Sequence, residues 1–194
     1  MNKRNYQKEM EDLIKELQKE EKVPSLLLHS CCAPCSSYVL EYLSDYFRIT
    51  VLYYNPNIFP ESEYKYRIEE QRRLIQSLPV RYPVSFMDTK YTPDDFYSRI
   101  KGLEKEKEGG RRCEKCFRLR LEYAAKLAEE KGFDFFTTTL SISPLKNAPL
   151  LNSIGTELAE IYHVPYLVSD FKKKNGYKRS VELSAEYELY RQNY

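Results

Sequence analysis

All five cysteines of this chain lie in two short segments that are far apart in the sequence. The first segment reads His29-Ser-Cys-Cys-Ala-Pro-Cys35, and the second reads Arg112-Cys-Glu-Lys-Cys116. Five cysteines placed at random in 194 residues would almost never gather in this way. Thiolates that are gathered together are soft ligands suited to iron–sulfur clusters, zinc or copper(I). We therefore expect the fold to bring both segments to one metal centre.

Each segment contains a Cys-x-x-Cys pair, and two such pairs supply four thiolates. Four thiolates complete either a [4Fe–4S] cluster or a tetrahedral zinc site. The fifth thiol, Cys31, has no role in a structural zinc site, whereas a redox site can use it. Arg111, Arg112 and Lys115 would stabilise thiolates, as would the positive end of a helix after each segment. A structural zinc site and a disulfide-exchanging dithiol are the alternatives, although the dithiol needs fewer cysteines.

The length of the chain is sufficient for one substantial core without disulfides. Residues 2–22 are mostly charged and polar, so they predict a surface helix rather than a signal peptide. No apolar run approaches the length of a membrane span, so we expect no membrane partner. We predict an N-terminal helix at 1–22, a single α/β catalytic domain at 23–194, and a cytoplasmic protein. In that compartment grouped cysteines more often bind metal or do redox chemistry.

Predicted strands and helices alternate along the chain. The strands are expected at 25–29, 47–54, 81–87, 133–138 and 165–168. Helices are expected at 36–46, 61–77, 116–130 and 180–192. A further helix is expected to begin at 92, and another is expected to end at 162. Such alternation implies right-handed crossovers, so we predict a three-layer, Rossmann-like α/β fold with a mainly parallel, five-stranded sheet. Ligands bind at the carboxyl ends of such strands, where these side chains should converge: Cys31, Asn55, Asp88 and Ser141.

The net charge of +2 does not mark a nucleic-acid binder, but the charge is unevenly distributed. Segment 171–179 contains five basic residues and no acid, namely Lys172, Lys173, Lys174, Lys178 and Arg179. A solvated surface is the simple alternative for such a run. Tyrosines beside basic residues can stack on unpaired bases, although most of the 18 tyrosines would pack in the core or at its rim. His29 ends a buried strand and is expected to be a hydrogen-bonded core residue.

Together with the two cysteine segments, three further motifs resemble the cobalamin-independent epoxyqueuosine reductases, the QueH family. They are Tyr53-Tyr-Asn-Pro-Asn-Ile-Phe-Pro60, Thr138-Thr-Leu-Ser-Ile-Ser-Pro144 and Tyr190-Arg-Gln192. The resemblance covers about 25–194, with the motifs in the same order. Members of that family often continue into a Cys-Gly-Cys tail, whereas this sequence stops at Tyr194.

The resemblance implies reduction of epoxyqueuosine to queuosine in tRNA, the last step in making this modified base. It implies a [4Fe–4S] cluster and allows a second iron beside it. It also implies a fold related to the HUP and PP-loop ATPase class, with the first cysteine segment in place of the phosphate loop. Removing an epoxide oxygen takes two electrons and two protons and releases water. An electron donor, which the sequence does not identify, must supply the electrons.

Under this hypothesis Cys32, Cys35, Cys113 and Cys116 are the main cluster ligands. Cys31 is the catalytic thiol, shared between the cluster and the second metal, and the exact division among the thiols stays open. A second iron would bind the epoxide oxygen as a Lewis acid. Asp88 is a candidate oxygen ligand or proton donor, with helix capping or a surface role as the alternative.

The substrate base would lie in an anticodon loop, where unpaired bases can stack on aromatic rings. Tyr53, Tyr54 and Asn57 are the candidates to hold it, with core packing as the alternative for Tyr53. The basic residues of segment 171–179 would contact phosphates. Two other functions stay open: a non-catalytic, zinc-stabilised tRNA-binding module, and a PP-loop-type tRNA sulfur transferase. The transferase is disfavoured because no Ser-Gly-Gly loop follows the first strand.

Overall fold

A parallel four-stranded sheet organises the molecule, and the computed structural model of the chain describes residues 4–191. The strand order is β3–β2–β1–β4, which places β1 at the centre between β2 and β4. The strands are β1 (Ser25–His29), β2 (Arg48–Tyr53), β3 (Ser85–Asp88) and β4 (Phe135–Thr138). The predicted α/β class and parallel sheet are therefore confirmed.

The sheet has four strands rather than the predicted five. Segment 165–168 contributes only an isolated bridge between Phe136 and Tyr166. Pro165 has no N–H to donate to a ladder. The carbonyl of Leu167 accepts a 2.7 Å hydrogen bond from the hydroxyl of Thr137 instead of a backbone amide. The segment therefore lies beside β4 without forming a fifth strand.

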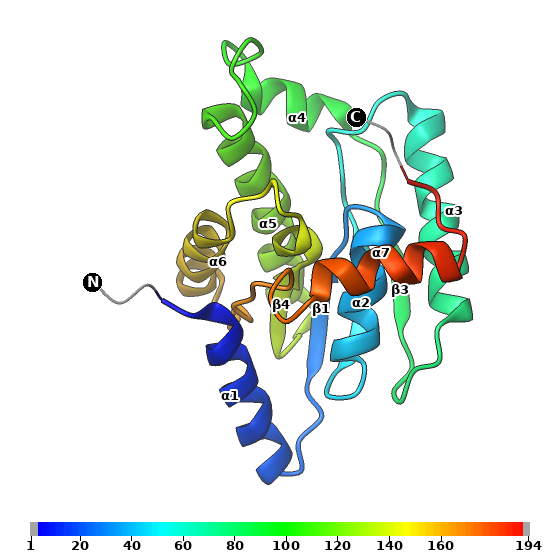
Figure 1. Cartoon of the computed structure of the whole chain (residues 1–194). Helices are drawn as coiled ribbons and strands as arrows, with labels where there is room; N and C mark the ends of the chain where they lie inside the picture. The colour runs from blue at the N-terminus through cyan, green and yellow to red at the C-terminus, as the bar shows by residue number, and fades with distance from the viewer. Residues whose placement is uncertain (1–3, 192–194) are drawn as a thin grey trace.

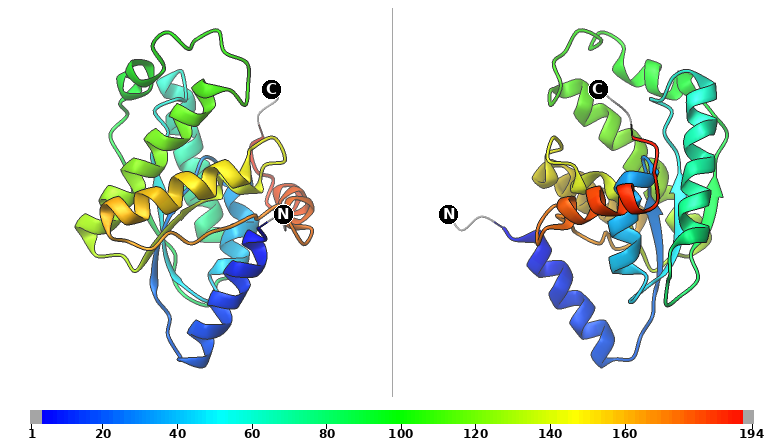
Figure 2. Two further views of the ribbon diagram at one scale, coloured as in Figure 1. Left: turned by 90° about the vertical axis from the view of Figure 1, so that its left-hand side faces the viewer. Right: turned by 45° about the vertical axis from the view of Figure 1, so that its right-hand side comes forward.

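Helices cover both faces of the sheet (Figures 1 and 2). They are α1 (Tyr6–Lys19), α2 (Ala33–Leu43), α3 (Glu61–Ser77), α4 (Pro93–Ile100), α5 (Arg111–Lys131), α6 (Ala148–Tyr162) and α7 (Gly176–Glu186), with a short 3-10 helix η1 (Thr139–Ile142). Helix α5 begins earlier than predicted, so it contains the second cysteine segment. The outer end of the predicted first helix falls on 1–3 and that of the last helix on 192, outside the described residues. Helix α7 begins four residues before the predicted 180 and ends at Glu186, so the prediction is wrong for 187–191, where Glu188 adopts a left-handed backbone with φ of 49°.

The side chains of β1 alternate between two hydrophobic clusters. Leu26 and Leu28 pack with α1, α2 and α3 on one face, and Leu27 packs with α5 and α6 on the other. All three are fully buried, as expected for a parallel strand covered on both faces. Each such leucine stabilises the fold by about 1.5–3 kcal/mol relative to an exposed one. No helix within 4–191 is long and apolar enough to cross a membrane.

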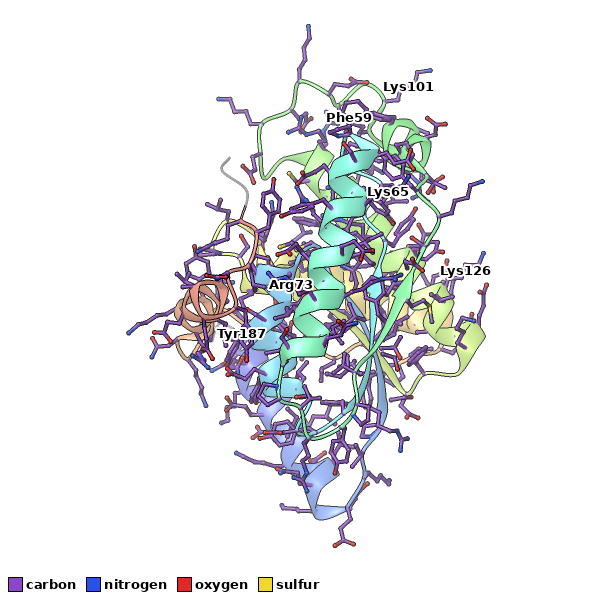
Figure 3. All side chains as sticks on the ribbon, turned by 90° about the vertical axis from the view of Figure 1, so that its right-hand side faces the viewer. Phe59, Lys65, Arg73, Lys101, Lys126 and Tyr187 are labelled. Atoms are coloured by element: carbon purple, nitrogen blue, oxygen red, sulfur yellow. The ribbon has the colours of Figure 1, made fainter. Side chains whose placement is uncertain are left out.

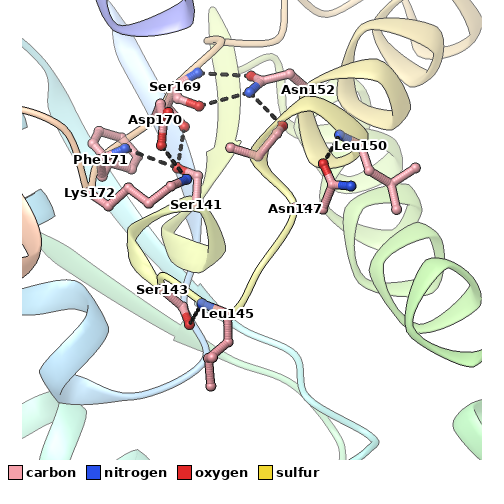
Figure 4. A network of polar contacts seen from close by, with 11 residues as sticks. Ser141, Ser143, Leu145, Asn147, Leu150, Asn152, Ser169, Asp170, Phe171 and Lys172 are labelled. Atoms are coloured by element: carbon pink, nitrogen blue, oxygen red, sulfur yellow. Dashed lines mark hydrogen bonds and ion pairs between the residues drawn. The ribbon is translucent and has the colours of Figure 1, made fainter. Parts of the chain in front are cut away.

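A buried polar network fixes the chain that follows β4 (Figure 4). The hydroxyls of Ser141, in η1, and Ser169 lie 2.8 Å apart. The Asn152 amide accepts from the backbone N–H of Ser169 at 2.9 Å and donates to its carbonyl at 2.8 Å. This network ties α6 and the segment after 168 to the carboxyl edge of the sheet.

Asn152→Ala should therefore destabilise the protein. The backbone N–H of Ser169 would stay buried without its acceptor, which costs about 1–3 kcal/mol. Urea unfolding measures this loss, with Ser153→Ala as the control, because Ser153 is an exposed residue on the same helix. Equal stability of the two variants would contradict the assigned role of the network.

Candidate metal centre

The first cysteine segment lies at the carboxyl end of β1 and begins α2. Cys32 is the N-cap of α2, and Pro34 lies in the first turn of that helix. The sulfur atoms of Cys31, Cys32 and Cys35 all lie within 4.8 Å of one another. Three thiols at the positive end of a helix form a group that can hold a metal or an anionic cluster.

The three thiols do not ionise independently. Hydrogen bonds from Cys32 and Cys35 lower the pKa of the Cys31 thiol well below its usual range. The same contacts with Cys31 raise the pKa of Cys32 and of Cys35. Cys31 is therefore the first of the three thiols to lose its proton. A bound metal would have to displace the protons of Cys32 and Cys35.

A buried arginine from α5 supplies positive charge to this group. Arg120 is 5% exposed, and its Nε donates to the carbonyl of Cys116 at 3.3 Å. The two cysteine contacts lower the pKa of Cys31 most, burial opposes them, and the charge of Arg120 lowers that pKa further. No carboxylate among residues 4–191 forms an ion pair with Arg120. The sequence analysis missed this residue, although its position one helical turn after Cys116 is a usable signal.

The second cysteine segment occupies the first turns of α5. Cys116 is buried, and the sulfur of Cys113 accepts a hydrogen bond from the Gly109 N–H at 3.2 Å. Cys113 packs against the same hydrophobic cluster as Cys31. Within the described residues these two thiols do not join the tight group of three. A four-iron cluster is larger than one ion, so its ligands stand farther apart, and the full ligand set stays a prediction.

A cavity of about 780 Å³ opens over the three cysteines. Its walls come from the loop after β2, from α3 and α7, from the segment after β4, and from the end of the described chain. The volume lies in the range of cavities that take small organic ligands. A more open hollow of about 550 Å³, lined by Pro24, Arg48 and Asp134 among others, contains no cysteine.

Asn57 lines the cysteine cavity, and its role in substrate binding stays a prediction. Its side-chain oxygen is buried and has no hydrogen-bond partner among residues 4–191. A buried acceptor without a donor is uncommon, so an N–H or O–H group of a ligand would satisfy it. Its neighbour Asn55 is held by a 2.8 Å hydrogen bond from its amide nitrogen to the carbonyl of Ser30.

The other predicted residues of the loop region lie differently. Tyr53 is fully buried, which matches the core packing that the sequence allowed for it. Tyr54 is 3% exposed, stacks on Tyr123 at 3.8 Å between ring centroids, and donates to Asp95. Neither ring offers a free face to a base in this structure. Asp88 forms a 2.8 Å ion pair with Arg72, and it is not among the residues that line the cavity.

The basic residues of segment 171–179 are largely neutralised. Four of the five lie in ion pairs: Lys172 with Asp170, Lys174 with Glu11, Lys178 with Glu182, and Arg179 with Glu41. Only Lys173 has no ion pair within the described chain. The segment is therefore a weak candidate for phosphate contacts, which stay a prediction.

His29 is a core residue, as the sequence indicates. Its Nδ1 lies 2.9 Å from the hydroxyl of Thr138 and its Nε2 lies 3.0 Å from the carbonyl of Tyr54. A carbonyl only accepts, so Nε2 carries the proton and the Thr138 hydroxyl donates to Nδ1. Burial, helped by the charge of Arg120, lowers the pKa of His29 to about 4.

Comparison with known proteins decides between the functions that the cysteines allow. The sequence model described as "Epoxyqueuosine reductase QueH" matches residues 26–194. The chain belongs to the QueH family. A QueH relative from Streptococcus pyogenes serotype M1, named "Epoxyqueuosine reductase QueH", is 44% identical over 192 residues, which is 98% of this chain and 75% of that protein.

Two further QueH relatives carry the same name. The protein from Staphylococcus epidermidis is 43% identical over 194 residues, covering 98% of this chain and 82% of its own length. The protein from Thermotoga maritima is 36% identical over 173 residues, covering 88% of this chain and 86% of its own length. The resemblance that the five motifs predicted is thus confirmed.

The pKa of His29 predicts a pH dependence of stability. Unfolding restores its ordinary pKa of 6.5, so below that pH the unfolded chain binds a proton that the folded chain does not bind until about 4. Stability is therefore lost as pH falls, by about 1.5 kcal/mol from this residue between roughly pH 6.5 and 5.

Urea unfolding of the metal-free protein at both pH values tests this expectation. His29→Asn should lose less stability on acidification than the parent protein, by the amount given above. His163→Asn, at an exposed helix end, is the matched control. If His29→Asn and the parent protein lose equal stability, the histidine is not held neutral by burial.

Proposed function

We propose that this chain reduces epoxyqueuosine to queuosine in tRNA by means of a thiolate-bound iron–sulfur centre. One observation carries the proposal: three cysteine sulfurs within 4.8 Å of one another line a cavity in a member of the QueH family. The five free thiols fit a reducing compartment, so we place the protein in the cytoplasm. Its electron donor is a further partner whose identity stays open.

The donor set fits iron better than it fits a hard cation, because all five candidate ligands are thiols. We propose Cys32, Cys35, Cys113 and Cys116 as ligands of a [4Fe–4S] cluster. Cys31, the most acidic thiol of the first segment, would be shared with a second iron. When bound, this centre supplies the electrons for removal of the epoxide oxygen. A role of Asp88 as acid or oxygen ligand requires it to leave its ion pair with Arg72.

The chain's own groups supply orientation and charge. The free oxygen of Asn57 would accept a hydrogen bond from the substrate inside the cavity. Arg120, which also lines the cavity, would offset the negative charge of the thiolates. The first cysteine segment follows the central strand β1 and begins α2, the place where PP-loop ATPases keep their phosphate loop. We therefore propose kinship with that fold class.

Replacing one proposed ligand tests the cluster. Cys113→Ala should lose iron, sulfide and the brown colour of the anaerobically purified protein, and its reduction of an epoxyqueuosine-containing RNA should fall to background. Binding of that RNA should stay largely intact, because Cys113 is not a wall of the cavity. Mass spectrometry of the RNA measures the loss of one oxygen, and Glu114→Ala on the same helical turn is the control.

Two outcomes would contradict this proposal. A colourless parent protein with one bound zinc would favour the non-catalytic tRNA-binding module. Normal reduction by Cys113→Ala would show that the ligand set is wrong.

Removing the buried charge tests the role of Arg120. Arg120→Gln should make the reduction potential of the bound cluster more negative, because reduction adds negative charge beside the missing cation. A change on the order of 1 kcal/mol in the free energy of one-electron reduction corresponds to a change of about 40 mV in the reduction potential. Arg120→Lys keeps the charge, so its reduction potential should stay close to that of the parent protein. Arg118→Gln is the control, because Arg118 lies on the same helix and pairs with Glu157 instead. A potential that Arg120→Gln leaves unchanged would refute this role.

A further inference from the structure

Exposed apolar side chains gather at the mouth of the cysteine cavity. Seven large hydrophobic side chains are exposed within the described chain, and four of them belong to this mouth: Tyr66, Leu145, Tyr177 and Tyr190. Three line the cavity, and Tyr66 packs edge-on against Tyr190 with ring centroids 4.8 Å apart. We call Tyr66, Tyr177 and Tyr190 the aromatic rim. Such a concentration at one opening marks an interaction surface.

The rim is assembled from three separate elements. Tyr66 lies on α3, Tyr177 lies in the first turn of α7, and Tyr190 follows α7 near the end of the described chain. The segment with Tyr190 runs beside α3, where Figure 3 labels Arg73 and Tyr187. Arg73 donates to the carbonyl of Tyr187 at 2.9 Å, and the N–H of Tyr190 donates to Glu70 at 3.0 Å. The backbone at Tyr190 is therefore fixed although its ring is exposed.

The charges beside the rim favour an anionic partner. Four cations line the cavity, namely Arg67, Arg120, Lys146 and Arg191, against two carboxylates. Both carboxylates are engaged, since Glu70 pairs with Arg73 at 2.9 Å and Glu108 pairs with Lys146 at 3.1 Å. Arg67 pairs with Glu63 at 2.8 Å, and Arg120 is buried beside the thiols. Arg191 is exposed and has no ion pair among residues 4–191. The mouth therefore presents the positive charge of Arg191 next to open aromatic rings.

Open aromatic rings beside positive charge are the combination that binds single-stranded nucleic acid. The cavity has room for one nucleoside, and the rim lies at its entrance. A base that reaches the cysteines leaves its neighbours in the strand outside, at the level of the rim. A fully paired duplex would first have to unpair and unstack its base, which costs about a few kcal/mol.

We propose that the aromatic rim stacks the unpaired nucleotides that flank the modified base, while that base enters the cysteine cavity. This inference rests on the proposed function and adds the surface by which the RNA loop is held. Tyr66 and Tyr190 form one stacking platform, and Tyr177 contributes from α7. Rim contacts are sequence-tolerant, because every base has a face that can stack.

Binding of an RNA hairpin with epoxyqueuosine in its loop tests the rim. Tyr66→Ala and Tyr190→Ala should each weaken binding by about 5- to 150-fold, the range expected for one lost base stack. Tyr190→Phe keeps the ring and should bind within about twofold of the parent protein. The control is Tyr97→Ala: Tyr97 is 51% exposed against 50% for Tyr66, but it lies on α4 away from the cavity. Fluorescence anisotropy at one salt concentration gives the Kd, and iron content confirms that each variant is folded.

The outcomes separate the rim from the proposed function. If the parent protein binds and reduces the hairpin, and Tyr66→Ala and Tyr190→Ala bind it equally well, the rim proposal is overturned and the function stands. An equal loss in Tyr97→Ala would also overturn it, because the effect would not belong to the rim. If the parent protein neither binds nor reduces the hairpin, both proposals fail. Selective loss in the two rim variants supports the inference.

Discussion

The burial of β1 on both faces is the constraint on which the site depends. Leu26, Leu27 and Leu28 are fully buried between the helices on the two faces, and the strand lies inside the sheet between β2 and β4. The chain becomes partly accessible to solvent only after His29, where the first cysteines follow. A rigid central strand thus delivers soft ligands to an edge where the loops after β2 and β4 also arrive.

Charge is the second organising force at that edge. Three sulfur atoms within 4.8 Å cannot all carry a negative charge without compensation. The first turn of α2 contributes positive potential through its backbone, and Arg120 contributes positive charge from α5. Two helices on opposite faces of the sheet therefore converge on one set of thiols. This convergence gives a physical reason for the second cysteine segment to lie on the same helix as Arg120.

The sequence predicts the individual helices and strands of this protein better than it predicts which distant residues meet at the site. Helix α3 has the predicted bounds, and β1 leads into the first cysteines as expected, because both follow from short-range hydrophobic patterns. The predicted fifth strand does not form, because Pro165 has no N–H to donate to the sheet. A hydrophobic pattern does not show that a hydrogen-bond donor is missing. Tyr53 and Tyr54 illustrate a different limit, since a pattern does not tell which tyrosine a neighbouring helix will cover. Arg120 and the rim come from elements distant in sequence, so only the folded chain brings them together.

The last described residues form a wall of the cavity, and this has a practical consequence. Tyr190 and Arg191 line the cavity at its entrance, so a polypeptide fused after them would begin beside the opening of the site. The beginning of α1 lies on another side of the molecule (Figure 1). An affinity tag or carrier protein is therefore better attached ahead of α1, where it leaves the approach to the thiols clear.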